Sequence, residues 1–348
     1  MGLRTMRTFF SERHRLHFPQ AELSGGQLVT PFERPSRVEH VLRRLRERGF
    51  PRPEEPGEAD AAAIARVHDG AFLDFLRTAW ADWVAEGMKG EIIAAGMPTR
   101  RQRHDRIPRN IDGKVSYYCH ASETAMTSGT WEAALSSAAS AQAATRAVQG
   151  GERAAFALCR PPGHHATADQ YGGYCFLNNA AVAAQALRDG GAGRVAVLDM
   201  DFHAGNGTQD IFWGRGDVLY ASVHGDPLDT YPWFSGFADE TGAGEGEGAT
   251  VNVPLPPGTG PGPWFEALDH LIGRVRAHGT EALVVSLGVD AYKADPISFF
   301  KLDSPDFAEA GRRIGRLRLP TVFCMVGGYA IEQVGVNTVN VLEGFEGA

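Results

Sequence analysis

The chain has 348 residues, 43% of them hydrophobic and 22% charged, and it carries a formal net charge of −8. This apolar content excludes an intrinsically disordered chain and is enough to bury a large core, so the length favours one large domain. The negative charge argues against a nucleic-acid-binding surface and suits cationic ligands better.

The first third of the chain has the features of helices. Ser36 and Glu39 have the spacing of a capping box ahead of a periodic apolar segment, and Gly49 is a suitable C-terminal stop. A second helical region is expected over about 60–87, with Asp60 as its N-cap.

Residues 88–130 differ from the segments on either side. They contain the basic cluster TRRQRHDR and the proline, glycine and serine content of a long irregular insertion. Two interpretations stay open: a variable, solvated surface excursion, and a lid or a contact between subunits.

From residue 154 onward, short apolar runs alternate with helical segments, which is typical of a parallel sheet with helical crossovers. The runs are too continuous in apolar character for strands with one wet face. They lie at 154–159, 194–201, 217–224, 281–290 and 319–328, and helices are expected near 179–189, 263–278, 305–317 and 331–345. The predicted fold class is α/β, with a central, mostly parallel sheet and helices on both faces.

Polar side chains gather at the carboxyl ends of four of these runs, where ligands bind in open α/β sheets. Because parallel strands end at the same edge, we expect these side chains to meet at one rim. They are His164, His165, Asp199, Asp201, His203, Asn206, Asp290 and Tyr329.

Three of these residues form a candidate metal site. Asp201 and His203 are two apart at a strand end, so their side chains leave the same side of an extended backbone, and Asp290 supplies a third ligand. One nitrogen and two oxygens suit zinc with an open fourth position, the catalytic pattern, although iron or cobalt also accepts these ligands. A lone D-x-H pair would be a chance occurrence, but the other strand-end residues make chance improbable.

The adjacent His164 and His165 are the expected proton carriers, because amide hydrolysis requires water to lose a proton and the departing amine to gain one. Asp199 and Asn206 are the available partners for the two rings, so the histidines are expected to differ in basicity. Tyr329 follows two glycines and is expected to hydrogen-bond a developing oxyanion. The sequence thus predicts a zinc-dependent amide hydrolase.

The cysteines indicate the redox environment. Cys119, Cys159, Cys175 and Cys324 show no C-x-x-C spacing, which favours free thiols in a reducing, cytoplasmic compartment. No apolar stretch approaches the length of a membrane span, so a membrane is not expected as a partner. The negative net charge likewise predicts no nucleic-acid partner.

The motifs RPPGHHA, DMDFHAGNGT, LGVD and GGY resemble, in order and over about residues 154–329, those of the histone deacetylase family. GGQLVTPFE, HGDP, DPISFFKL and GVNTVNVLEGF resemble its bacterial acetylpolyamine amidohydrolase branch, so the resemblance covers nearly the whole chain. It implies an arginase-like fold and a single deacetylase domain over 1–348. It also implies that the insertion at about 88–130 forms a lid or the contact of a homodimer.

The resemblance also implies roles for individual residues. Zinc ligands are Asp201, His203 and Asp290; His165 is the general base, His164 the general acid or electrostatic partner, and Tyr329 the group that polarises the carbonyl. A substrate tunnel is lined by Gly173, Tyr174 and Tyr231, and a buried potassium site includes Asp199 and Ser222.

Two positions depart from the family pattern. Tyr231 occupies a tunnel-wall position that is often Phe, which implies a more polar entrance. Asn206 stands where many eukaryotic class I members have Asp, so their proton-transfer scheme does not carry over directly.

For the substrate, the resemblance implies an acetylated polyamine or another small cationic acetylamide, with Glu22 and Asp112 as acids that meet a distal ammonium at the tunnel mouth. The acidic gatekeeper of the eukaryotic polyamine deacetylase has no counterpart here, where the corresponding residues are Pro296 and Ile297.

Three alternatives compete with this interpretation on sequence alone. The first is a lysine deacetylase that acts on acetyl-lysine proteins or small acyl-lysine compounds with the same zinc chemistry. A two-metal ureohydrolase is disfavoured, because it requires a D-x-H-x-D pattern that DMDFHAGNGT lacks. A catalytically silent polyamine-binding protein is disfavoured because Tyr329 and the zinc ligands are all present.

Overall fold

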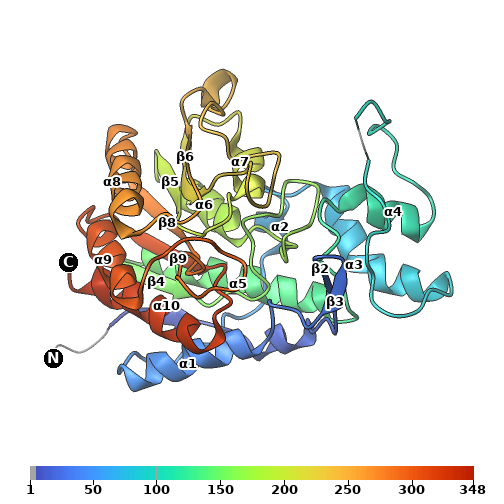
Figure 1. Ribbon diagram of the computed structural model, residues 1–348, viewed down its shortest axis with the longest axis horizontal. Coiled ribbons are helices and arrows are strands. Elements are labelled where there is room, and N and C mark those ends of the chain that lie inside the picture. The colour runs from blue at the N-terminus through green and yellow to red at the C-terminus, as the bar shows by residue number, and fades with distance from the viewer. Residues whose placement is uncertain (1–4, 99) are drawn as a thin grey trace.

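The centre of the molecule is a seven-stranded sheet, seen in a computed structural model that describes residues 5–98 and 100–348 (Figure 1). Every neighbouring pair of strands is parallel, in the order β1-β4-β9-β8-β5-β6-β7. The strands are β1 (Arg7–Phe9), β4 (Ala154–Ala157), β5 (Val195–Asp199), β6 (Val218–Gly225), β7 (Thr250–Leu255), β8 (Ala282–Leu287) and β9 (Thr321–Met325). The five predicted strands are confirmed, while β1 and β7, at the two edges of the sheet, were not predicted.

Helices cover both faces of this sheet, as predicted. They are α1 (Ser36–Glu47), α2 (Ala61–Ile64), α3 (Gly70–Ala85), α4 (Ile111–Tyr118), α5 (Thr130–Gln149), α6 (Asn179–Asp189), α7 (Asn206–Phe212), α8 (Pro261–Ala277), α9 (Ser304–Gly315) and α10 (Ile331–Glu346). Along β5, Val195 and Val197 enter the core shared with α3, α5 and α6, whereas Ala196 and Leu198 enter the core shared with α1, α8, α9 and α10. This alternation follows from the period of two in a strand, and burial of both faces explains the continuous apolar runs.

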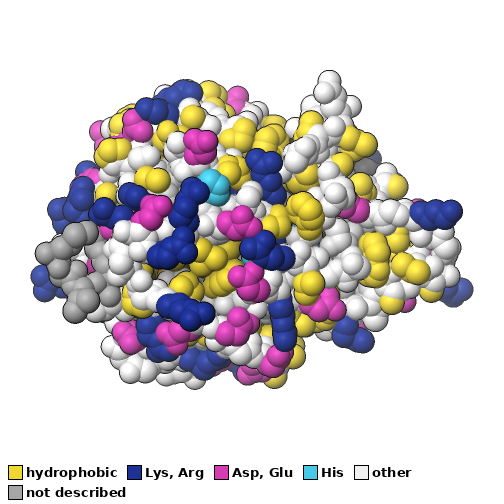
Figure 2. Space-filling view, turned by 90° about the horizontal axis from the view of Figure 1, so that it is seen from below, with side chains coloured by type: hydrophobic (Ala, Val, Ile, Leu, Met, Phe, Trp, Pro, Cys, Tyr) yellow, Lys and Arg dark blue, Asp and Glu magenta, His cyan; other side chains and the backbone are white. Residues whose placement is uncertain are grey.

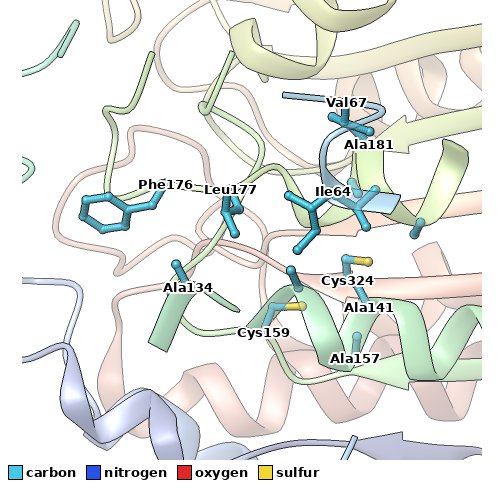
Figure 3. Close-up of a cluster of buried hydrophobic side chains, with 14 of the residues drawn as sticks. Ile64, Val67, Ala134, Ala141, Ala157, Cys159, Phe176, Leu177, Ala181 and Cys324 are labelled. Carbon is cyan, nitrogen blue, oxygen red and sulfur yellow. The ribbon is translucent and has the colours of Figure 1, made fainter. Parts of the chain in front are cut away.

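Helix α5 packs on the sheet through small side chains. Ala141 of this helix lies beside Ala157 of β4 and near Cys159 and Cys324 (Figure 3). Most of α5 is buried, so it lacks the polar face that gives an amphipathic helix its pattern, and it was not predicted from the sequence.

The helices of the first third differ in detail from the prediction. The Ser36–Glu39 capping box is wrong, because Pro35 is the N-cap and no side chain caps α1, although Gly49 with φ +74° follows the helix as expected. The region 60–87 contains two helices, and Asp60 caps the first of them, α2, as predicted. Asp69 accepts hydrogen bonds from two backbone N–H groups at the start of α3.

The insertion 88–130 is only partly irregular, because it contains α4. Helix α4 and the insertion around it lie at one side of the molecule, away from α8 and α9 (Figure 1). Ile92 forms an antiparallel bridge with Met126, which ties the beginning of the segment to its end. A small hairpin, β2 (Glu22–Ser24) paired with β3 (Gln27–Val29), stands apart from the main sheet.

Two surface findings bear on possible partners. On the face shown in Figure 2, basic and acidic side chains are interspersed, so this face carries no stripe of a single charge. Within 5–98 and 100–348, no helix combines the length and the apolar character that crossing a bilayer requires.

Candidate metal centre and tunnel

The sheet topology brings the predicted site residues together. Strands β4, β9, β8 and β5 are consecutive neighbours in the sheet, and each is followed by one of the polar segments. The loop after β4 carries His164 and His165, and the one after β9 carries Tyr329. Four chain segments far apart in sequence therefore meet at one edge, as the sequence predicted.

Asp201, His203 and Asp290 form a compact buried cluster. One ligand atom from each lies within 4.8 Å of the others. Nδ1 of His203 is 3.3 Å from Oδ1 of Asp201 and 3.2 Å from Oδ2 of Asp290. Backbone amides hold the carboxylates in place, since Asp201 accepts from Gly327 and Asp290 accepts from Phe202.

The electrostatics of this cluster fit a bound cation. Burial and the neighbouring charge of Asp201 raise the pKa of Asp290 to about 8, since two buried carboxylates without a cation repel each other. Burial would lower the pKa of His203, but its contacts with Asp201 and Asp290 raise it to about 10. One nitrogen and two oxygen donors match a catalytic zinc site.

Two glycines make room for the cluster. A Cβ on Gly288 would lie 2.1 Å from Oδ2 of Asp201, and one on Gly327 would lie 2.4 Å from Oδ2 of both Asp201 and Asp290. No side chain fits at either position, so the backbone just after β8 and β9 can approach the carboxylates only because these residues are glycine.

The tandem histidines have different partners. Nδ1 of His164 lies 2.9 Å from Oδ2 of Asp199, and Nδ1 of His165 lies 2.7 Å from Oδ1 of Asn206. Burial opposes a charge on both rings, but Asp199 raises the pKa of His164, whereas burial and the charge of His164 hold the pKa of His165 well below its usual range. The two rings thus differ in basicity, as expected, with His165 the neutral one.

Tyr329 is held in place from two sides. Arg37 donates to the carbonyl oxygens of Gly328 and Val326, and its guanidinium lies 4.8 Å from the centre of the Tyr329 ring. On the other side, Asp295 accepts from the backbone N–H of Tyr329 at 2.7 Å. The turn that carries Tyr329 is therefore bound by a cation through its carbonyls and by an anion through its amides.

A pocket of about 330 Å³ opens above these residues. His165, His203 and Tyr329 lie among its lining, together with the predicted tunnel residues Gly173, Tyr174 and Tyr231. Tyr174 and Tyr329 have ring centres 5.7 Å apart, and Tyr231 packs edge-on against His165 at 4.8 Å. The pocket is thus an aromatic passage that leads to the metal cluster.

The two acids expected at the mouth have different positions. Glu22 lines the pocket but is only 3% exposed, and it accepts from Oη of Tyr174 at 3.1 Å and from the backbone N–H of Phe32. Burial raises its pKa to about 7. Asp112 lies in the first turn of α4 and is not part of this pocket in the described chain.

Glu123 was not predicted from the sequence. It lines the pocket, and its Oε1 accepts from the backbone N–H of Gly173 at 3.1 Å. Burial raises its pKa. A single Glu in HASETAMT has no distinctive spacing, so the sequence offers no signal for it; only the fold of the insertion brings it to the tunnel wall.

The residues expected at a potassium site are adjacent in the sheet. Asp199 of β5 pairs with Ser222 of β6 in the parallel register, and both are fully buried. Oγ of Ser222 lies 2.7 Å from Nδ1 of His224, and Asp199 is the partner of His164.

Comparisons with known proteins agree with this geometry. Residues 31–345 match the model of the histone deacetylase domain. The chain is 53% identical to the acetylpolyamine amidohydrolase of Mycoplana ramosa, over 98% of this chain and 100% of that one. It is also 53% identical to acetylpolyamine amidohydrolase 1 of Pseudomonas aeruginosa, over 99% of each chain. The crystal structure of the acetylpolyamine aminohydrolase from Burkholderia pseudomallei superposes with a TM-score of 0.93 at 42% identity, over 98% of both chains.

Proposed function

This chain belongs to the histone deacetylase family, and we propose that it hydrolyses the amide bond of acetylated polyamines, releasing acetate and a free amine. The observation that carries the proposal is a carboxylate, Glu123, in the wall of a narrow aromatic passage that ends at a metal-binding cluster. A carboxylate removed from water binds an ammonium more strongly than one at an exposed surface does.

Asp201, His203 and Asp290 are the residues that would hold a zinc ion. When bound, zinc supplies the Lewis acidity that polarises an amide carbonyl and acidifies a water molecule. The hydroxyl of Tyr329 donates a hydrogen bond to the carbonyl oxygen as negative charge develops there.

His165 and His164 divide the proton transfers. Because the amide oxygen of Asn206 only accepts, Nδ1 of His165 carries a proton and its Nε2 is free to take one from the attacking water. The same nitrogen then returns the proton to the departing amine. The contact with Asp199 favours the protonated form of His164, which would stabilise the negative charge that forms nearby.

We also propose a structural potassium ion beside Asp199 and Ser222, and a cytoplasmic location. The potassium proposal rests on the family resemblance and on the adjacency of these residues in β5 and β6. The location rests on the four cysteines, which are all buried and free, as in chains of reducing compartments.

We further propose that the chain is a single deacetylase domain that pairs with a second copy through the insertion 88–130. Ile107 in the insertion is 46% exposed. In the loop after β6, which also carries Tyr231, Leu228 is 77% exposed and Phe234 is 81% exposed. Apolar groups at this exposure favour a covering partner. Sedimentation at micromolar concentration is expected to give a dimer; a monomer would contradict this proposal.

The enzymatic proposal is tested by turnover of the zinc-loaded protein on N-acetylputrescine, N8-acetylspermidine and an acetyl-lysine peptide, measured separately. Fast hydrolysis of the polyamines with little peptide activity is expected. Equal or greater turnover of the peptide would replace the polyamine function by the lysine deacetylase alternative. Loss of all three activities in Tyr329→Phe serves as the control that the measured activity comes from this site.

A further inference from the structure

Tyr231 forms one wall of the tunnel and is linked to a second polar residue behind it. Its ring lies edge-on to His165 at 4.8 Å, and its Oη is 3.3 Å from Nδ1 of His120. The rings of His120 and Tyr231 are nearly parallel, with an angle of 13° between them. Neither residue has a place in the hydrolytic steps described above.

The tautomer of His120 follows from its second contact. Nε2 of His120 is 3.0 Å from the backbone oxygen of His165. A carbonyl oxygen only accepts, so Nε2 carries the proton. Desolvation lowers the pKa of His120, which keeps the ring neutral and leaves Nδ1 without a proton. Nδ1 is therefore an acceptor, and the hydroxyl proton of Tyr231 points to it.

The position of the His120 ring is fixed by its surroundings. A Cβ on Gly172 would lie 2.5 Å from the ring, so the backbone at Gly172 is in direct contact with it. The backbone N–H of His120 donates to the carbonyl oxygen of Tyr171. The ring cannot turn without losing its bond to His165, which fixes the direction of its acceptor nitrogen.

We propose that His120 is a positioning residue that keeps Tyr231 as a hydrogen-bond acceptor in the tunnel. Tyr231 thereby selects acetylpolyamines that carry an ammonium group between their two ends. Since the hydroxyl proton of Tyr231 is donated to Nδ1 of His120, the phenol oxygen can only accept hydrogen bonds from a ligand. This inference rests on the proposed hydrolysis of acetylpolyamines and specifies which of them the tunnel favours.

The number of hydrogen-bond donors on an internal secondary ammonium matches the number of acceptors on Tyr231 and Glu123. Such a group has two N–H donors, and two residues of the pocket lining from different segments, Tyr231 and Glu123, each carry an acceptor oxygen. The two acceptors are close enough for the charge of Glu123 to raise the pKa of Tyr231, after burial as the larger cause. A methylene group in the same place would leave both acceptors unpaired, which costs binding energy.

The test compares N8-acetylspermidine with mono-N-acetyl-1,8-diaminooctane, which has the same length and terminal ammonium but a methylene in place of the internal nitrogen. Wild-type protein is expected to prefer the acetylspermidine in kcat/KM. Tyr231→Phe keeps the ring and removes only the oxygen, and it is expected to reduce this preference about tenfold, the usual cost of one hydrogen bond to a charged group. The change is expected in KM rather than in kcat, because Tyr231 has no part in the proposed hydrolytic steps.

His120→Gln separates positioning from structure. The amide nitrogen of Gln can replace Nε2 and keep the bond to the His165 carbonyl, but the amide oxygen of Gln does not take the place of Nδ1 as the acceptor for Tyr231. The preference is expected to fall in this variant as in Tyr231→Phe, and the double variant is expected to show no further loss. Tyr117→Phe, which removes a hydroxyl that donates to the carbonyl oxygen of His104 in the insertion, is the matched control and is expected to keep the wild-type preference.

The outcomes are distinguishable. Wild-type protein that hydrolyses neither acetylated amine overturns the proposed function and this inference with it. Hydrolysis of both by the wild type, with a preference that Tyr231→Phe leaves unchanged, overturns only the role of Tyr231. A preference lost in Tyr231→Phe but kept in His120→Gln contradicts the positioning role of His120. Spermidine and 1,8-diaminooctane binding, measured by calorimetry on the same variants, is expected to show the same ratios without turnover.

Discussion

The catalytic floor and the tunnel mouth of this molecule are built in different ways. We use catalytic floor for Asp201, His203, Asp290, His164, His165 and Tyr329, and tunnel mouth for Glu22, Leu23, Glu123, Tyr231 and Trp233. Every residue of the floor is under 10% exposed and follows one of four adjacent strands, whereas Leu23 and Trp233 at the mouth are both 49% exposed. The mouth comes from three separate segments: the β2–β3 hairpin, the insertion and the loop after β6.

This difference suggests that the floor carries out the hydrolysis, whereas the mouth determines which substrates are accepted. The sheet fixes the floor, because strand ends bring the proposed metal ligands and proton carriers to one edge, with backbone amides holding the carboxylates. The mouth can vary without disturbing that edge, because its segments contribute little to the sheet. Changes at the floor should therefore lower kcat for every substrate, and changes at the mouth should alter the choice among substrates.

The largest effect is expected from His165→Ala. The substitution removes the imidazole that is proposed to take the proton from water, so kcat should fall about 10²- to 10⁴-fold for both acetylpolyamine and peptide substrates. Steady-state kinetics on both substrates measure this, with zinc content determined in the same samples. A loss confined to one substrate would contradict a shared floor.

A slightly smaller effect is expected from Tyr329→Phe. Removing one donor to the developing oxyanion should lower kcat about 10²- to 10³-fold while the KM of N8-acetylspermidine changes little. Arg37 still contacts an aromatic ring in the variant, so the fold should be retained. Thermal unfolding provides the control; a Tm that drops markedly would assign the lost activity to misfolding rather than to the missing hydroxyl.

Glu123→Gln should sharpen the comparison at the mouth. The substitution keeps an acceptor for the Gly173 amide but removes the charge, so KM for acetylpolyamines should rise about tenfold, as for loss of one charge-assisted hydrogen bond. The kcat for the same substrates and the kinetics of N-pentylacetamide, which has no ammonium, should stay near wild type. An equal effect on the uncharged amide would mean that Glu123 shapes the tunnel rather than binds cations.

The smallest effect is expected from pH acting on Glu22. Burial raises its pKa to about 7, so the carboxyl is mostly protonated below pH 7 and anionic above it. The KM of N8-acetylspermidine should therefore fall about fivefold between pH 6 and pH 8, a change in binding of about 1 kcal/mol. Glu22→Gln should remove this dependence, and a KM that still changes with pH in the variant would assign it to another group.

Much of the floor could be predicted from the sequence because its residues stand in short motifs at strand ends. DMDFHAGNGT supplies two of the proposed metal ligands and the hydrogen-bond partners of both histidines, and the parallel sheet then brings Asp290 beside them. The alternation of β5 between two cores explains why the strands were recognisable as continuous apolar runs.

The rest could not be predicted for physical reasons. Glu123 and His120 belong to an insertion without periodicity, and they reach the tunnel through contacts with Gly173 and His165 that involve backbone atoms, which leave no trace in sequence patterns. The position of Glu22 depends on the burial of its carboxyl under Tyr174, and composition does not report burial. Helix α5 was missed because its own small side chains are buried around most of its circumference, so it shows no amphipathic pattern.

The most direct test of the account is an internal competition. Zinc-loaded protein is given equal concentrations of N8-acetylspermidine and an acetyl-lysine peptide, and both products are quantified by mass spectrometry from the same reaction, so that their ratio reports kcat/KM for the two substrates. At least about a tenfold preference for the polyamine is expected, since only that substrate brings an ammonium to the carboxylate of Glu123 in the tunnel wall. Equal consumption of the two substrates, or faster consumption of the peptide, would contradict it.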